Sequence, residues 1–310
     1  MGRPLTSVLR RTDLQISRRR RRRERSVRIV LVAAAAFSIA VSAAIVVSLL
    51  GNAVAFFIQV DKATLWSDGW FPRRGMYDIR TILAGTLVIS TIAMIIAAPL
   101  GIASAIYLSE YAGRRTRRVL KPVLETLASI PSVVLGFFAL TWISPNIIQP
   151  LSGAPLSNMA AAGVAVGMLI TPLVASISED ALHAVPLYLR EAAYGLGARK
   201  RTTSLRVVVP AAVSGIVAAL LLAFSRAIGE TMIVAIAAGG TGGSLLQLNP
   251  FAPGQTMTGA MTALAIGSDQ VRGAALTFES LFFVGMLLFV LTLVLNLVSD
   301  AFVRRVRRAY

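Results

Sequence analysis

The residues at 211–238 read AAVSGIVAALLLAFSRAIGETMIVAIAA, and this stretch decides the class of fold. Its only charged residues are Arg226 and Glu230. A helix of about 20 apolar residues is long enough to cross a bilayer core of roughly 30 Å. The stretch therefore predicts a membrane-spanning helix rather than a segment of soluble core.

Five more apolar segments of similar length lie on either side of this stretch. They are 29–57, 82–108, 123–143, 159–177 and 278–302. The chain of 310 residues is 56% hydrophobic and 15% charged, whereas a soluble domain carries about a quarter charged residues. The sequence predicts an all-α integral membrane bundle of about six transmembrane helices. We divide it into a basic N-terminal segment, 1–28, a retained anchor helix, 29–58, and a membrane domain, 80–303.

Composition excludes several kinds of site. The chain has no cysteine and one histidine, His183, so disulfides, zinc–thiolate sites and multi-histidine metal sites have no residues to form them. We expect no metal site, no cofactor in this chain and no special role for His183. The net charge of +17 does not indicate a nucleic-acid partner, because the basic residues lie between apolar segments. We interpret the run Arg18–Arg23 as a topology determinant that contacts anionic membrane lipid.

The distribution of lysine and arginine predicts the orientation of the chain. With the N-terminus in the cytoplasm, 25 of the 31 basic residues fall in the cytoplasmic parts 1–28, 109–122, 178–210 and 303–310. Basic residues are retained on the cytoplasmic side of bacterial membrane proteins. We therefore expect both termini in the cytoplasm of a bacterial cell, and a multi-pass protein of its cytoplasmic (inner) membrane.

Two stretches interrupt the regular pattern of spans. Ser129-Ile-Pro-Ser132 is a candidate broken helix, where freed carbonyls can line a pathway. The outer stretch 239–277 contains the apolar run 257–266, which is too short to span and predicts a re-entrant or surface-lying helix. It begins with the glycine-rich GGTGG at 239–243, but no lysine follows as a phosphate-binding loop requires. An ATP-driven mechanism would therefore need a separate ATPase.

The cytoplasmic connection 186–210 reads PLYLREAAYGLGARKRTTSLRVVVP. Pro186 suits the start of a short helix, and the glycines at 195 and 197 suit its end. Small Ala192 and Ala193 permit close insertion into a partner's groove. Without further context, the stretch could also be an ordinary amphipathic surface helix between two spans.

This connection resembles the Glu-Ala-Ala loop of bacterial ABC importer permeases. Glu191, Ala192, Ala193, Gly197 and Pro210 have the spacing of that motif, and valines at 207 and 209 replace its Ile and Leu. The resemblance implies the type I ABC importer permease (MetI-like) fold. It also implies that the loop couples the membrane domain to an ATPase through these five residues.

Roughly residues 80–300 resemble the PstC-type permeases of the phosphate-specific transport system. The resemblance rests on the stretches at 98–111, 129–138, 178–182 and 225–234. It implies a non-enzymatic translocation subunit that moves inorganic phosphate into the cell. The implied partners are a second, PstA-like permease, a dimeric PstB-like ATPase that binds ATP and magnesium, and a PstS-like extracytoplasmic phosphate-binding protein.

Arg226 and Glu230 are the strongest candidates for the substrate pathway, because charges inside a span are costly and are usually functional. Their spacing in an unbroken helix predicts that they share one face. The guanidinium of Arg226 can bind a phosphate oxyanion in a bidentate way, and Glu230 would hold the arginine in place. We add Ser132 and Thr231 to the candidate pathway. A neutralising structural ion pair is the alternative interpretation.

Other functions remain open at this point. Arg226 alone does not distinguish phosphate from sulfate, molybdate or another small oxyanion. A transporter driven by an ion gradient, or a channel, would need no ATPase, and the Glu-Ala-Ala loop argues against both.

Overall fold

The computed structural model describes residues 18–240, 242–266 and 276–307. Only the backbone is described for 18–23 and 302–307. The predicted basic segment 1–28 therefore lies partly outside the described residues. Residues 267–275 of the outer stretch lie wholly outside them. The proposed lipid contacts of Arg18–Arg23 concern side chains that also lie outside them.

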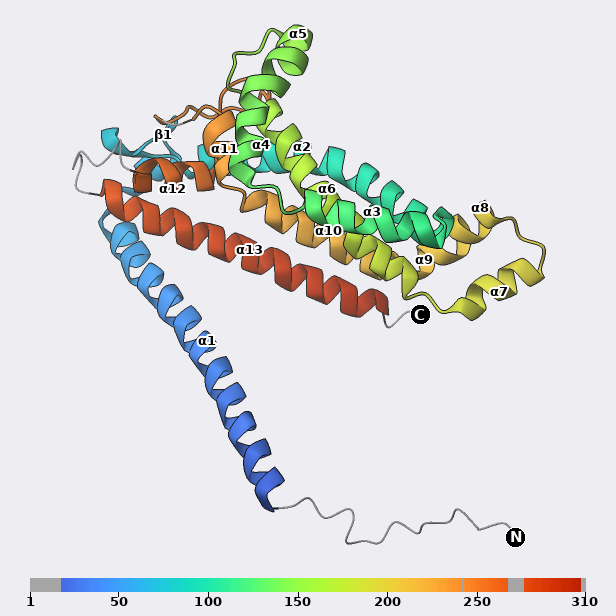
Figure 1. Ribbon diagram of the computed structural model, residues 1–310. Helices are drawn as coiled ribbons and strands as arrows, with labels where there is room; N and C mark the ends of the chain where they lie inside the picture. The colour runs from blue at the N-terminus through green and yellow to red at the C-terminus, as the bar shows by residue number, and fades with distance from the viewer. Residues whose placement is uncertain (1–17, 241, 267–275, 308–310) are drawn as a thin grey trace, which may run out of the picture. The chain divides into compact units, whose positions relative to one another are not determined.

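The described chain is almost entirely helical, with one two-stranded hairpin (Figure 1). Its elements, with η for short 3₁₀ or π turns, are α1 (Arg18–Gln59), η1 (Lys62–Trp66), β1 (Trp70–Phe71), η2 (Pro72–Arg74), β2 (Met76–Tyr77), α2 (Ile79–Ile106), η3 (Tyr107–Tyr111), α3 (Arg114–Leu127), α4 (Ser132–Phe138), η4 (Ala139–Ile148), α5 (Gln149–Ser152), α6 (Met159–His183), α7 (Leu187–Gly195), α8 (Lys200–Thr203), η5 (Ser204–Val208), α9 (Val209–Ala211), α10 (Val213–Ile228), α11 (Met232–Ala237), α12 (Met257–Ile266) and α13 (Thr277–Arg307).

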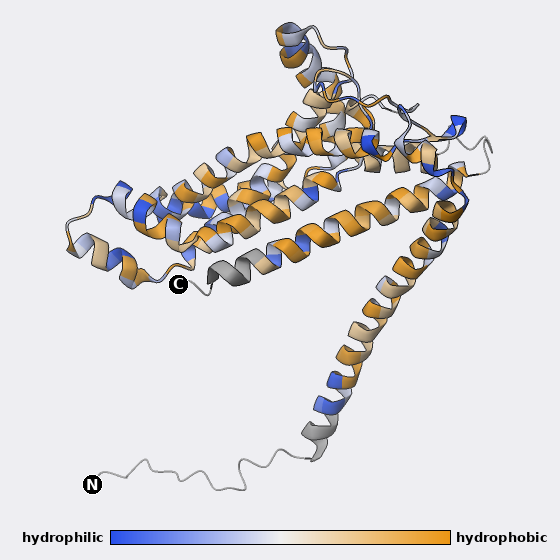
Figure 2. Cartoon of the chain, turned by 180° about the vertical axis from the view of Figure 1, so that it is seen from behind, coloured by the Kyte–Doolittle hydropathy of each residue, from blue (hydrophilic) through white to orange (hydrophobic). Residues whose placement is uncertain are grey.

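The predicted number of spans is confirmed within the described part of the chain. Five helical stretches there are long and apolar enough to cross a membrane, namely Glu24–Gln59, Ile79–Tyr111, Ser132–Ser152, Met159–His183 and Thr277–Ala301. A sixth is formed if Lys200–Ala211 and Val213–Ile228, which meet at a bend of 68°, count as one broken span. Figure 2 shows hydrophobic residues along the long helices and hydrophilic residues gathered near α3 and α7.

Two predicted spans have the wrong limits. The segment 123–143 is divided by a turn after α3, so the candidate break at Ser129–Ser132 is confirmed and the long helical stretch begins only at Ser132. The segment 211–238 is not one helix, because α10 ends at Ile228 and α11 begins at Met232. Apolar composition predicts membrane residence but does not detect a break that leaves the composition apolar.

The chain divides into two compact units, residues 1–51 and 52–310. The described part of the first unit is the N-terminal part of α1, a continuous helix whose apolar side chains are mostly exposed. The second unit contains the rest of α1 and all the other elements, and its most extensive packing joins α2 to α6.

Small residues allow the close approach of α2 and α6. Gly163 and Gly167 of α6 lie four residues apart, and a Cβ at Gly163 would lie 2.8 Å from Ile92 Cβ. A Cβ at Gly167 would lie 3.0 Å from the Ala93 carbonyl oxygen. Membrane helices associate largely through such contacts, because lipid offers no hydrophobic driving force for their association. This pair forms the core that positions both ends of the second unit.

The ends of the second unit differ in structure. At one end, α12 lies beside the β1–β2 hairpin, and at the other end lie α7 and α8 (Figure 1). Aromatic residues close the hairpin end, where the Phe56 ring packs against Tyr77 at 5.1 Å and against Phe283 at 5.0 Å between ring centroids. The short helix predicted at 257–266 is confirmed as α12.

Candidate functional site

The first candidate site is the helix break at residues 229–231. α10 ends at Ile228 and is followed by Gly229, and the Glu230 carboxylate oxygen Oε1 accepts hydrogen bonds from the backbone N–H groups of Met232 (3.2 Å) and Ile233 (3.4 Å). These N–H groups belong to the first turn of α11 and have no partner within that helix. Glu230 therefore stabilises the start of α11.

Threonine hydroxyls satisfy the carbonyls freed by this break. Thr258 of α12 donates to the Glu230 carbonyl at 2.7 Å, and Thr231 donates to the Gly229 carbonyl at 3.2 Å. Irregular backbone within a membrane is tolerated where it is packed in protein or lines a cavity. Hydrogen bonds therefore stabilise the irregular backbone at the break, and one of them comes from α12.

The expected pairing of Arg226 with Glu230 is wrong in this structure. The helix ends between the two residues, so the i,i+4 geometry of an unbroken helix does not form. Glu230 turns its carboxylate to α11 instead, while Arg226 is exposed in the last turn of α10. A cation is favourable at a helix C-terminus, where the backbone dipoles present partial negative charge.

Ser132 and Thr231 lie at the starts of neighbouring helices. Ser132 is the first residue of α4, and Thr231 directly precedes α11. The two helices pack closely at Gly136, where a Cβ would lie 3.2 Å from the Ile233 Cα atom. Both side chains are half-buried. Of the four predicted pathway residues, these two and Glu230 therefore lie around the starts of α4 and α11.

The two helices also run in the same direction (Figure 1). Asn158 shows this, because its amide nitrogen Nδ2 donates to Ser144 Oγ beyond α4 at 3.0 Å. Its backbone N–H donates to the carbonyl of Ala237, the last residue of α11, at 3.0 Å. The broken ends of both helices thus face the same way.

A further polar residue, Asn296 of α13, was not identified from the sequence. Ser225 Oγ donates to its Oδ1 atom at 3.3 Å, which joins α13 to the turn of α10 that carries Arg226. Asn296 and Arg226 are both exposed at the surface of the described chain. Polar groups in apolar spans face protein or water rather than lipid. The only sequence signal was a single amide in the apolar run 278–302.

The second candidate site is the loop that carries the Glu-Ala-Ala motif. α7 begins directly after Pro186, as predicted, and ends in a reversal at Gly197, whose φ is +76°. The Ala198 N–H donates to the Ala193 carbonyl at 3.0 Å, and the Gly197 N–H donates to the Tyr194 carbonyl at 2.9 Å. This is the hydrogen-bond pattern of a Schellman motif, which favours glycine at the left-handed position.

The motif residues of α7 are open to a partner. Glu191 and Ala192 are exposed, and Ala193 is half-buried. Near them, Tyr188 is 65% exposed and Leu196 is 90% exposed. Adjacent exposed apolar side chains at the end of a bundle are typical of an interaction surface.

Arg190 joins α7 to the rest of the bundle. Its guanidinium donates to the carbonyl of Leu182, in the last turn of α6, at 2.8 Å, and to the carbonyl of Val185, just after that helix, at 2.6 Å. It also donates to Glu110 in η3 at 2.8 Å. The side chains of Arg190 and Glu110 are only 13% and 4% exposed. One arginine therefore connects the motif helix to the ends of both core helices.

Pro210, the last motif residue, lies where the loop enters the membrane domain. It is the middle residue of the three-residue helix α9, directly before the 68° bend into α10. Proline has no N–H group for the preceding turn, which favours such a bend. Pro210 thus links the loop to the helix that carries Arg226.

A charged cluster fastens α3 to the end of α6. The fully buried carboxylate of Glu179 pairs with Arg117 and with Lys121, the latter at 2.7 Å. Lys121 also contacts Asp180 at 2.7 Å. Hydrogen bonds to Asp180, which has the larger effect, and to Glu179 raise the pKa of Lys121 above its ordinary value. His183 Nδ1 lies 3.4 Å from Arg117 at the edge of the cluster. Glu179 lies in the stretch 178–182 that carries part of the family resemblance, but the sequence gave no signal of this structural role.

The fold defines a class of membrane protein. A methionine ABC transporter structure, MetNI in an inward-facing conformation, shares 21% identity with a TM-score of 0.52, over 72% of this chain and 91% of that chain. A bacterial ABC transporter that imports alginate shares 15% identity with a TM-score of 0.55, over 84% and 94%. These similarities show the fold of the membrane permeases of ABC importers.

Sequence comparison then identifies the family. Residues 97–308 match the binding-protein-dependent transport system inner membrane component family, and the chain belongs to it. The phosphate transport system permease protein PstC of Mesorhizobium japonicum is 32% identical over 292 residues, covering 86% of this chain and 88% of that protein. PstC of Pasteurella multocida is 30% identical, with coverage of 86% and 87%. The probable ABC transporter permease protein YqgH of Bacillus subtilis is 34% identical, with coverage of 70% and 68%.

Proposed function

We propose that this chain is a permease subunit through which an ATP-driven importer moves inorganic phosphate across the cytoplasmic membrane into the cell. The observation that carries this proposal is the similarity to PstC permeases at 30–32% identity over 86% of the chain. The exposed motif helix α7 supports it, because an ATP-driven permease needs a surface on which a separate ATPase can act.

The proposed complex contains three further kinds of subunit. A second permease of the same fold completes the pathway, a dimeric ATPase binds ATP and magnesium, and an extracytoplasmic binding protein delivers phosphate. The chain itself cleaves no bond. α7 docks on the ATPase through Glu191, Ala192 and Ala193, and Gly197 and Pro210 shape the loop around it.

The connections of α7 supply a mechanism for coupling. When the ATPase dimer closes on ATP, it moves α7, and Arg190 carries this movement to α6 and to η3 at the end of α2. The loop also continues through Pro210 into α10. Movement of α10 repositions Arg226, which binds the phosphate oxyanion beside Ser132, Glu230 and Thr231 at the helix breaks.

Reconstitution of the four kinds of subunit in lipid vesicles tests the proposal. We expect accumulation of radiolabelled phosphate that requires ATP and the binding protein, and that excess sulfate leaves unchanged. Sulfate or molybdate uptake in place of phosphate uptake would contradict the substrate. Uptake driven by an ion gradient without ATP would contradict the mechanism.

The proposed orientation places both termini and α7 in the cytoplasm. Cysteine labelling tests it cleanly, because the native chain has no cysteine. Thr202 and Ser152 are both exposed and lie in different connections. On intact cells without an outer-membrane barrier, an impermeant thiol reagent should label Ser152→Cys and spare Thr202→Cys. The reverse pattern would invert the topology and exclude α7 as the ATPase contact.

A further inference from the structure

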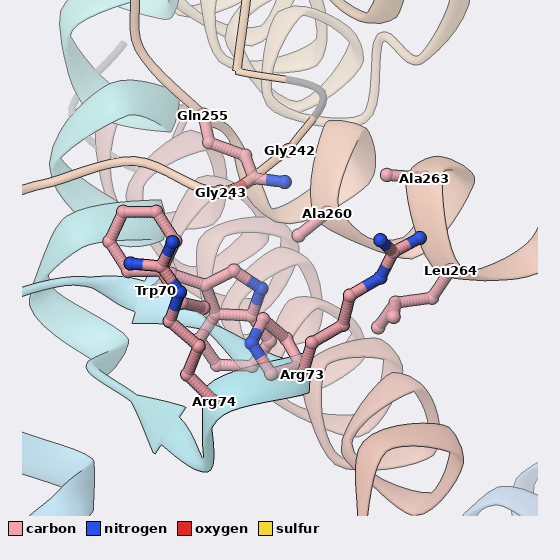
Figure 3. Close-up of a pocket in the computed structure, with 11 residues that line it drawn as sticks. Trp70, Arg73, Arg74, Gly242, Gly243, Gln255, Ala260, Ala263 and Leu264 are labelled. Atoms are coloured by element: carbon pink, nitrogen blue, oxygen red, sulfur yellow. The ribbon is translucent and has the colours of Figure 1, made fainter. Parts of the chain in front are cut away.

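A pocket of about 230 Å³ lies at the hairpin end of the second unit, opposite α7. Its walls come from the hairpin and η2, from the loop at Gly242 and Gly243, and from α12. Figure 3 shows Gln255 on the wall opposite Arg73 and Arg74. In the proposed orientation this pocket faces the outside of the cell.

The pocket is cationic. Arg73 and Arg74 are both exposed, and no acidic side chain is among its described lining residues. The Arg74 guanidinium lies 5.3 Å from the centroid of the Phe71 ring, so a cation–π contact holds it at the pocket wall. Cationic clefts with apolar walls raise the local concentration of anions.

Two buried polar atoms of the lining residues have no hydrogen-bond partner among the described residues. They are the Trp70 indole nitrogen Nε1 and the Gln255 amide oxygen Oε1, and the side chains are 0% and 4% exposed. Buried polar groups are normally paired, so an orphan donor and an orphan acceptor beside a cationic pocket indicate a missing ligand. Both atoms are buried, so contact with a ligand requires a shift of the side chains that cover them.

These groups match one chemical class of ligand. A hydrogen phosphate ion offers negative oxygens to the guanidinium and indole N–H groups, and a P–OH group that can donate to the Gln255 oxygen. Sulfate is fully deprotonated at neutral pH and has no group to donate. The cations therefore attract any small oxyanion, whereas the Gln255 acceptor favours a protonated one.

Gln255 also connects the pocket to the helix break. It lines a second, smaller cleft with Val234 and Ala235 of α11 and with Thr256. Thr258, three residues after Gln255, donates to the Glu230 carbonyl at the break. The chain thus places Gln255 between the outer pocket and the candidate pathway.

We infer that this pocket, formed by Trp70, Arg73, Arg74 and Gln255, is an outer binding site where phosphate rests between its release from the binding protein and its entry into the membrane pathway. This inference rests on the proposed function for the identity of the anion. It adds a site and residues that lie away from Arg226 and the helix breaks.

Trp70 provides a direct reporter of binding. The chain has three tryptophans, and the other two, Trp66 and Trp142, are exposed and can be replaced by phenylalanine. Inorganic phosphate is titrated into the purified full chain in detergent at constant ionic strength, with no ATP or partner present. We expect a saturable change in Trp70 emission, and a weaker response to sulfate.

Variants of Arg74 separate specific binding from general charge. Arg74→Gln should raise the Kd for phosphate by about tenfold, because it removes a charge-assisted hydrogen bond, and Arg74→Lys should raise it less. Lys62→Gln removes the same charge from a residue that does not line the pocket, and should leave the Kd unchanged. Transport by the Arg74→Gln complex should then fall most at low phosphate.

Three results would overturn the inference. They are the absence of a saturable Trp70 response in the unmodified pocket, an equal response to sulfate, and equal weakening by Arg74→Gln and Lys62→Gln. Because the titration needs no transport, any of them can occur while the vesicles still accumulate phosphate. A failure of the proposed function would appear instead as loss of ATP-driven phosphate uptake in the unmodified complex.

Discussion

The α7 end of the second unit and the helix break at residues 229–231 are held together by different interactions. At the α7 end, buried or half-buried ion pairs join separate helices, as in Arg190 with Glu110 and Glu179 with Lys121. At the helix break, a carboxylate and threonine hydroxyls satisfy single backbone groups. Removing one partner of a buried ion pair costs about 3–5 kcal/mol, whereas single hydrogen bonds such as those at the break each contribute about 1–3 kcal/mol. We therefore propose that the α7 end transmits movement and that the break yields to it.

The largest effect should come from breaking the Arg190 connection. Arg190→Met leaves the Glu110 carboxylate buried without its cation and leaves the Leu182 and Val185 carbonyls without their donor, at a cost of about 3–5 kcal/mol. Thermal unfolding of the purified chain in detergent measures this loss. The double variant Arg190→Met with Glu110→Leu should recover much of it, because no charge is then buried. A single variant as stable as the native chain would show that the connection is unimportant.

A smaller effect is expected from the turn that ends α7. Gly197→Ala places a side chain at φ +76°, which costs about 1–2 kcal/mol and should reduce co-purification of the ATPase several-fold. Gly195→Ala is the matched control, because Gly195 is the last residue of α7 and has no positive φ. Equal ATPase recovery with both variants would remove the turn from the docking surface.

The cap at the helix break should have a comparable or smaller effect. Glu230→Leu removes the acceptor for the N–H groups of Met232 and Ile233, which should cost about 1 kcal/mol of stability. Glu230→Gln keeps an oxygen at the same place and should remain close to the native chain in thermal unfolding. If Gln were as destabilising as Leu, the charge of Glu230 rather than its capping bond would be the important property.

The least change is expected from pH at the α3–α6 cluster. The pKa of Lys121 is raised, so its stabilising contribution is complete below the unfolded value of about 10.4 and is lost only above it. The difference in melting temperature between the native chain and Lys121→Met should therefore be constant from about pH 6 to pH 9. A difference that shrinks within this window would contradict the raised pKa.

The same contrast explains what the sequence could predict. The α7 loop was predicted correctly in its start and its glycine reversal, because proline and glycine act locally. The end of α10 before Gly229 was missed, because the segment 211–238 is apolar apart from a few residues and was read as one helix, and Glu230 was assigned to the wrong partner. The turn before Ser132 was detected because Pro131 marks it.

The remaining features depend on contacts between distant parts of the chain. Arg190 meets Glu110, 80 residues earlier, and Ser225 meets Asn296, 71 residues later. No local pattern encodes such partners. The pocket at Trp70 and Gln255 was missed for the same reason, since its walls come from three separate segments. The sequence predicted which residues are costly to bury in a membrane, but not what they contact.

We propose that Arg226, exposed beside the helix break, binds the transported phosphate. The most direct measurement is ATP-driven phosphate uptake by reconstituted complexes carrying Arg226→Lys, normalised to the amount of assembled complex. Lysine keeps the charge but loses the bidentate guanidinium geometry, so we predict intact assembly and uptake reduced by about an order of magnitude. Uptake equal to that of the native complex, by Arg226→Lys and also by Arg226→Met, would contradict the claim.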